Sequence, residues 1–125
     1  MRNDIVLSRL GHTWLIDLDG CVFSHNGHLR GEDQLLPGVA EFWTSIPTND
    51  TIILLTSRTE EHAEQTERSL ERFALRYDRV VYGLPYGERI VINDAKPSGL
   101  VTASAIVLDR DRGMVDLNIR IDDEL

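Results

Sequence analysis

The feature that most constrains the fold is an apolar run at residues 51–56, which reads Thr-Ile-Ile-Leu-Leu-Thr. A β-branched and leucine-rich run without polar alternation is typical of a strand that is covered on both faces. Such strands occur mainly in parallel sheets, whose neighbouring strands are joined by crossover segments that usually contain a helix. The run therefore predicts an α/β protein with a mainly parallel sheet.

Short β-rich runs alternate with helical patterns along the rest of the chain, as this fold class requires. The further predicted strands are 13–18, 79–83, 89–94 and 104–109, and the tail after Gly113 is compatible with one more.

Two helices are predicted between these strands. The first is short and begins at Pro37, because proline is favoured in the first turn of a helix. The second runs from about Thr59 to Tyr77, where Ser57 and Glu60 match a capping box. Leu70, Phe73, Ala74 and Tyr77 share one face of that second helix at spacings of three and four.

Length and composition favour one globular domain over residues 1–125, with 13 basic and 21 acidic residues and a net charge of −8. This charge disfavours nonspecific binding to nucleic acid or to anionic membranes. The single cysteine cannot form an internal disulfide. Because no signal peptide or membrane-length apolar run is present either, we expect a cytoplasmic protein.

The strongest chemical motif is Asp17-Leu18-Asp19-Gly20, which ends the predicted strand 13–18. Side chains two residues apart on a strand share a face, so Asp17 and Asp19 are expected to project together. Two adjacent carboxylates repel each other unless a cation lies between them, and Mg²⁺ is the simplest hard cation with oxygen ligands. The alternative is an Asp-Gly turn in which both acids are solvated.

Two further polar groups follow predicted strands: Thr56-Ser57-Arg58 after 52–55, and Asn93-Asp94 after 90–92. In a parallel sheet these strand ends lie side by side, and ligands bind there. Together they supply acids for a metal, and a hydroxyl next to a helix N-terminus that can bind phosphate. This combination indicates a phosphoryl-transfer site.

On these residues the chain resembles phosphatases of the haloacid-dehalogenase (HAD) superfamily over about residues 13–97. The first family motif matches Asp17-Leu18-Asp19-Gly20, the second matches Thr56 and the fourth matches Asn93-Asp94. The resemblance implies a Rossmann-like three-layer sandwich, with a core at about 12–110 and a flap at about 20–34.

The resemblance also implies roles for the site residues. Asp17 would be the nucleophile that forms an aspartyl-phosphate, and Asp19 would act as general acid and then as general base. Thr56 would hydrogen-bond a phosphoryl oxygen. Mg²⁺ would be held by the Asp17 carboxylate, the Asp19 backbone carbonyl and Asp94. Gly20, Ser57 and Arg58 are the expected substrate-binding residues.

Two positions depart from the family pattern. Cys21 stands where threonine is common, and Leu84 stands where members often carry the lysine that steadies nucleophile and phosphate. Lys96, the only lysine of the chain, is the obvious substitute, and Arg58 is the alternative.

Cys21, His25 and His28 could be mistaken for a zinc-binding set. Their spacing matches no standard zinc site, and the segment is rich in glycine. We expect a histidine of the flap to reach toward the substrate or its leaving group instead.

The intervals 20–55 and 57–82 are too short to hold a cap domain, so the site is expected to be open. The expected partner is a small phosphorylated metabolite such as a sugar phosphate, without nucleic acid or membrane, and a homodimer is compatible with an exposed site. One alternative is a catalytically silent HAD-like binding domain, which the leucine at position 84 favours. Another is a nucleotidase or polynucleotide phosphatase, of which the polymer version needs a basic groove.

Overall fold

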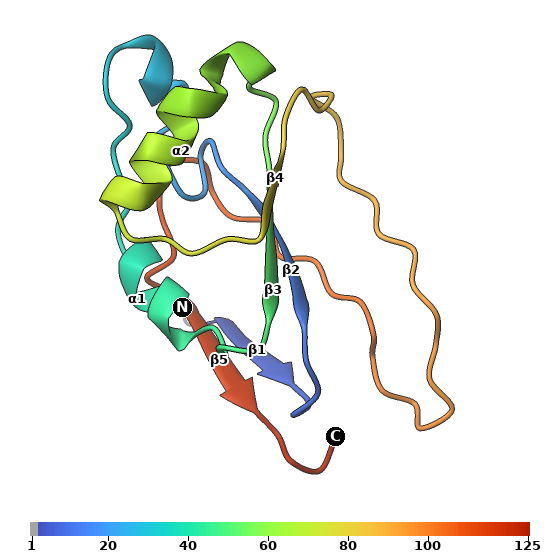
Figure 1. The fold of residues 1–125 in the computed structure, drawn as a ribbon. Helices are drawn as coiled ribbons and strands as arrows, with labels where there is room; N and C mark the ends of the chain where they lie inside the picture. The colour runs from blue at the N-terminus through green and yellow to red at the C-terminus, as the bar shows by residue number, and fades with distance from the viewer. Residues whose placement is uncertain (1–2) are drawn as a thin grey trace.

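The computed structural model describes residues 3–125, which form two parallel sheets and two α-helices (Figure 1). The central sheet contains β2 (Thr13–Asp17), β3 (Thr51–Leu55) and β4 (Arg79–Val81), in that order. The second sheet pairs β1 (Asn3–Leu7) with β5 (Leu117–Ile121). The prediction of an α/β chain with parallel strands is therefore confirmed.

β3 occupies the centre of the three-stranded sheet, but Ile53 and Leu55 are only half-buried, so one of its faces is less covered than its apolar sequence predicts. Its register pairs Thr51 with Thr13 and Leu55 with Asp17, so β2 and β3 end at the same level. Ile52 and Leu54 are completely buried. The other fully buried apolar residues come from the turn after β2 and from both helices: Leu18, Val22, Phe23, Val39 and Leu70.

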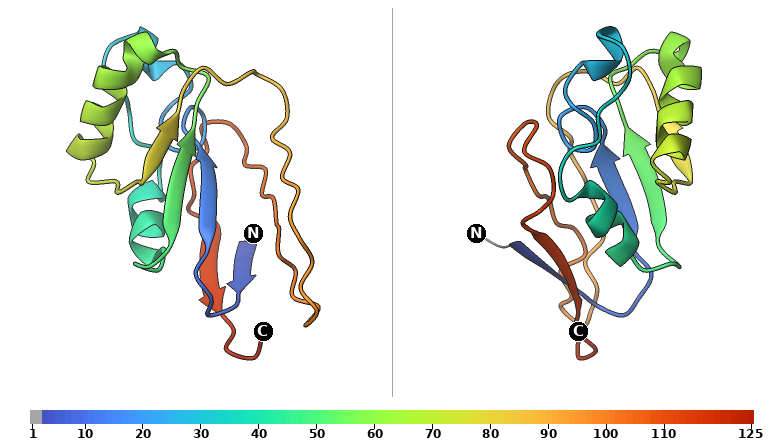
Figure 2. Two further views of the ribbon diagram at one scale, coloured as in Figure 1. Left: turned by 45° about the vertical axis from the view of Figure 1, so that its right-hand side comes forward. Right: turned by 90° about the vertical axis from the view of Figure 1, so that its left-hand side faces the viewer.

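The helices are α1 (Val39–Ser45) and α2 (Ala63–Arg72), and single 3-10 turns form η1 (Gly27–Leu29) and η2 (Glu60–His62). Both helices lie on the same side of the central sheet, whereas the extended chain of residues 84–109 runs along the other side (Figures 1 and 2). The second helical layer of the expected three-layer sandwich is thus not present in residues 3–125. Neither helix in this range has the length and apolar composition that a bilayer crossing requires.

The second helix is shorter than the sequence predicts, because it ends at Arg72 rather than Tyr77. Ala74 adopts a left-handed conformation with φ of 56°, and the Leu75 amide donates to the Leu70 carbonyl at 3.0 Å. This turn brings Leu75 into the core, where it is 4% exposed. The predicted capping box of Ser57 and Glu60 is not formed either. The residue that precedes η2 is Thr59 and not Ser57, and Thr59 makes no side-chain capping hydrogen bond.

The predicted strands 89–94 and 104–109 are wrong, since neither segment pairs with another strand in the structure. Their β-branched residues are largely exposed, as Ile92 at 92% and Val107 at 95% illustrate. Local composition favours an extended backbone here, but a strand also requires a partner for its amide and carbonyl groups. The extended segment of residues 84–109, called the excursion below, has two arms that are linked by hydrogen bonds. The Asn93 side-chain amide donates to the Thr102 carbonyl, and the Thr102 hydroxyl donates to the Asp94 carbonyl.

The tail returns to the body of the protein through residues 113–121. The Met114 amide donates to the Pro37 carbonyl at 2.8 Å just before α1 begins. The tail then forms β5, which fits the expected final strand. β5 pairs with β1, a strand that was not predicted from the sequence.

Candidate functional site

Three predicted site residues meet where β2 and β3 end. Asp17 is the last residue of β2, and Thr56 directly follows β3. The Leu18 amide donates to the Leu55 carbonyl at 3.0 Å, which extends the pairing of the two strands past Asp17. The Thr56 hydroxyl donates to Oδ2 of Asp19 at 3.3 Å. The sequence motifs at 17–19 and 56 therefore lie in one cluster.

A tight turn after Asp17 places Asp19 in this cluster. The Leu18 carbonyl accepts hydrogen bonds from the amides of Val22 at 2.9 Å and Phe23 at 3.0 Å. Gly20 supplies the left-handed conformation that the turn needs, with φ of 88°. Its amide donates to the Phe23 carbonyl at 2.7 Å. Gly20 thus shapes the turn that carries Asp19.

Arg58 also binds Asp19. Its Nη2 atom lies 2.9 Å from Asp19 Oδ1, and its Nε atom lies 3.2 Å from Asp19 Oδ2. The same guanidinium donates from Nη2 to Asp33 Oδ1 at 2.7 Å and from Nη1 to the Thr66 hydroxyl at 2.9 Å. The side chain of Arg58 is only 1% exposed. These carboxylates raise the pKa of Arg58 despite its burial, so it stays charged.

Asp33 is a member of this site that the sequence did not reveal. Its side chain is fully buried and also accepts a hydrogen bond from the Ser69 hydroxyl at 2.7 Å. Its partners Arg58 and Ser69 lie 25 and 36 positions further along the chain. No local pattern around Asp33 signals these long-range contacts.

Asp17 is the accessible acid of the pair, with a side chain that is 41% exposed, whereas that of Asp19 is 15% exposed. Partial burial raises the pKa of Asp17, and the neighbouring charge of Asp19 adds to this effect. Arg89 opposes it, with Nη2 at 3.7 Å from Asp17 Oδ1. Arg89 is therefore a cation beside the expected nucleophile, and the sequence analysis did not single it out.

Two histidines complete the surroundings of Asp19. Nδ1 of His28 lies 3.9 Å from Asp19 Oδ1, and the His28 side chain is 6% exposed. The His28 ring packs edge-on against the ring of His62, with 4.8 Å between their centroids. Burial lowers the pKa of His28, and the positive charge of Arg58 lowers it further.

Asp94 and Lys96 are not brought to this cluster. Both are exposed in the irregular excursion, and Lys96 forms no ion pair with any residue in the range 3–125. No three acids, histidines or cysteines of the described chain lie together as metal ligands. Ser57 is half-buried and has no side-chain hydrogen bond among these residues.

Cys21 lies in the turn beside the acids. Burial raises the pKa of its thiol to about 11, and the charges of Asp17 and Asp19 add to the shift. A thiol with this pKa is protonated at neutral pH and is a poor nucleophile or metal ligand.

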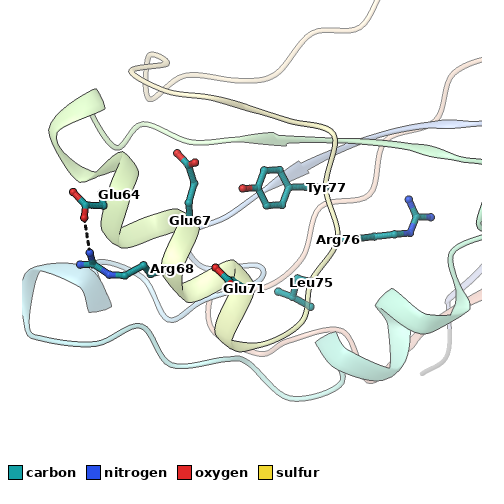
Figure 3. A pocket seen from close by; sticks show the side chains of 7 residues that line it. All are labelled: Glu64, Glu67, Arg68, Glu71, Leu75, Arg76 and Tyr77. Carbon is teal, nitrogen blue, oxygen red and sulfur yellow. Dashed lines mark hydrogen bonds and ion pairs between the residues drawn. The ribbon is translucent and has the colours of Figure 1, made fainter.

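One hollow of the surface lies elsewhere, beside α2 and the turn that follows it (Figure 3). Its lining is mainly charged and includes none of the predicted site residues: Glu64, Glu67, Arg68, Glu71, Leu75, Arg76 and Tyr77. Three of these are acids, which repel a phosphorylated ligand. The strand-end cluster therefore remains the candidate site.

Comparison with known proteins gives one informative similarity. No family model matches the chain, and no curated protein gives a significant match. The chain is similar to a chain of the solved Pnkp1/Rnl/Hen1 complex, with 26% sequence identity and a TM-score of 0.51. The similarity covers 66% of this chain and 31% of that chain, so it concerns less than a third of the larger protein.

Proposed function

We propose that this chain is a Mg²⁺-dependent phosphatase that hydrolyses a phosphomonoester through an aspartyl-phosphate. The observation that carries the proposal is the cluster of Asp17, Asp19 and Thr56 at the ends of two adjacent parallel strands. Ligands of open α/β sheets bind at this edge. The resemblance to HAD phosphatases assigns the chemistry to the same residues.

Asp17 is suited to be the nucleophile because its carboxylate is the more accessible of the two. Its oxygen would form a bond to phosphorus while the bond from phosphorus to the leaving oxygen breaks. Asp19 would give a proton to that oxygen, and would then take a proton from the water that hydrolyses the aspartyl-phosphate. Arg58 and Thr56 donate hydrogen bonds to both Asp19 oxygens, which positions the carboxylate for the step in which it takes the proton.

Some of the oxygen ligands that the proposed Mg²⁺ ion needs lie among the described residues. The Asp17 carboxylate and the Asp19 backbone carbonyl are two oxygen ligands of the kind that Mg²⁺ takes. Asp94, the third proposed ligand, does not join them. When bound, Mg²⁺ would offset the repulsion between Asp17 and the phosphate. Arg89 supplies positive charge at the same carboxylate.

The proposed substrate is a small phosphorylated metabolite, with a sugar phosphate as the first choice. A second candidate is the phosphorylated end of a nucleotide or polynucleotide. It is favoured by the similarity to a chain of a complex that contains a polynucleotide kinase-phosphatase. The net charge of −8 disfavours a long nucleic acid, so a nucleotide or a short end is the form to test.

A panel of phosphomonoesters distinguishes these candidates. Purified protein with Mg²⁺ is incubated with sugar phosphates, nucleoside monophosphates and a 3′-phosphorylated oligonucleotide, and released phosphate is measured with and without EDTA. Faster release from sugar phosphates supports the first choice, and faster release from the oligonucleotide supports the second. If no compound is hydrolysed but one of them binds, the silent binding domain is the better account.

A further inference from the structure

Nδ1 of His28 has an unusual environment. Among residues 3–125, it is the one buried side-chain nitrogen or oxygen without a hydrogen-bond partner. An unpaired polar atom in the interior costs about 1–3 kcal/mol, so its presence beside a candidate site calls for an explanation.

The atom that Nδ1 faces is a carboxylate oxygen of the site. Asp19 Oδ1 lies 3.9 Å away, which is about 1 Å longer than a hydrogen bond of this kind. The other sides of Asp19 are already occupied, because Arg58 and Thr56 donate to its two oxygens. Oδ1 already accepts from Arg58, but a carboxylate oxygen has two lone pairs, so it can accept a hydrogen bond from His28 as well.

The flap that carries His28 is anchored near both of its ends, by the His25 amide to Asp111 at 2.8 Å and by the buried pair of Asp33 with Arg58, whereas the 3-10 turn around His28 has weaker contacts. Gln65 donates to the carbonyls of His28 at 3.4 Å and Gly31 at 3.1 Å. A displacement of about 1 Å closes the gap to Asp19 without breaking any β-sheet hydrogen bond. The His28 ring also packs edge-on against the ring of His62.

We propose that His28 is a positioning residue for Asp19, donating a hydrogen bond from Nδ1 to Oδ1 when the flap at residues 20–34 closes over bound substrate. This inference rests on the proposed function, because it concerns Asp19 as the residue that transfers the proton. The contact orients the carboxylate toward the leaving oxygen. The hydrogen bond from His28 is added to those that Arg58 donates to Asp19 and does not replace them.

Three variants separate this role from simple packing. His28→Phe keeps a ring against His62 but removes both nitrogens, and His28→Asn restores an N–H near the position of Nδ1. We expect kcat to fall by about 10- to 100-fold in His28→Phe, with KM changed less than twofold, and to recover in large part in His28→Asn. Leu29→Ala, in the same 3-10 turn and 62% exposed, is the matched control and should behave as the wild type. Wild-type kcat in His28→Phe, or equal loss in His28→Phe and His28→Asn, overturns the proposal.

A spectroscopic measurement makes the test independent of turnover. In protein with ¹⁵N-labelled histidine and saturating inorganic phosphate, which stands in for the substrate, the His28 ring should carry its proton on Nδ1, and that signal should shift in Asp19→Asn. The hydrogen bond between His28 and Asp19 is contradicted if Nδ1 carries no proton, or if its signal is the same in the wild type and in Asp19→Asn. If the wild type releases no phosphate, the proposed function fails, and this signal still decides whether His28 contacts Asp19.

Discussion

Arg58 donates from Nη2 to Asp33 Oδ1 at 2.7 Å, and both side chains are shielded from solvent. A buried ion pair of this kind is strongly destabilised when one partner is removed, because the other charge is left without compensation. It also connects the flap to α2 through the hydrogen bond between Asp33 and Ser69. The pair therefore links the packing of the flap to the candidate site, since Arg58 also holds Asp19.

Replacing Asp33 with alanine should lower the free energy of unfolding by about 3–5 kcal/mol, measured by urea denaturation. Glu32→Ala is the matched control. Glu32 is the neighbouring acid and pairs with Arg72 at 2.7 Å, but its side chain is 79% exposed, so its loss should cost less than about 1 kcal/mol. An equal loss of unfolding free energy in the two variants would show that the buried pair stabilises the fold no more than the exposed pair does.

Arg89 and Lys96 can be compared as the cation that serves Asp17. Because Arg89 lies 3.7 Å from the Asp17 carboxylate, Arg89→Ala should reduce kcat/KM about tenfold or more. Lys96→Ala should have a smaller effect, since Lys96 lies in the exposed excursion. A larger loss in Lys96→Ala than in Lys96→Arg and in Arg89→Ala would show that Lys96 replaces the missing family lysine after all.

The single cysteine gives a pH-dependent prediction. Burial raises the pKa of the Cys21 thiol from 9.0 to about 11, so the folded state holds this proton more tightly than the unfolded state. The resulting contribution to stability is complete below pH 9 and is lost as the pH rises toward 11. Alkylation by iodoacetamide at pH 9 should therefore be at least several-fold slower in native protein than in urea. Equal rates in the two states would contradict a protected thiol.

The position of the tail can be tested at Gly38, which has φ of 78° and lies against the tail at Val115. A Cβ atom at this position would lie 2.7 Å from the Val115 Cα atom. Gly38→Ala should therefore lower the free energy of unfolding by about 2 kcal/mol or more. Gly11→Ala is the control, because its Cβ would meet no atom within 4 Å. Similar melting temperatures for both variants would argue against this docking of the tail.

The comparison of sequence with structure shows which signals are local. β3 could be predicted from its apolar run, and the cluster of Asp17, Asp19 and Thr56 followed from parallel strands that end together. Asp33 and Arg89 could not be predicted, because their contacts with Arg58 and Asp17 join residues far apart in the chain. The segment 89–94 shows the opposite error, since strand-like composition does not supply a pairing partner.

The central claim is that Asp17 carries the phosphoryl group. Its most direct test is phosphate release from the best substrate of the panel by wild type and by Asp17→Asn, both purified identically and assayed with Mg²⁺. Asparagine has nearly the same shape but lacks the nucleophilic carboxylate, so we expect release by Asp17→Asn to fall to the background rate at an unchanged melting temperature. Release at the wild-type rate by Asp17→Asn would contradict the account, because the activity would then belong to another nucleophile or to a contaminating enzyme.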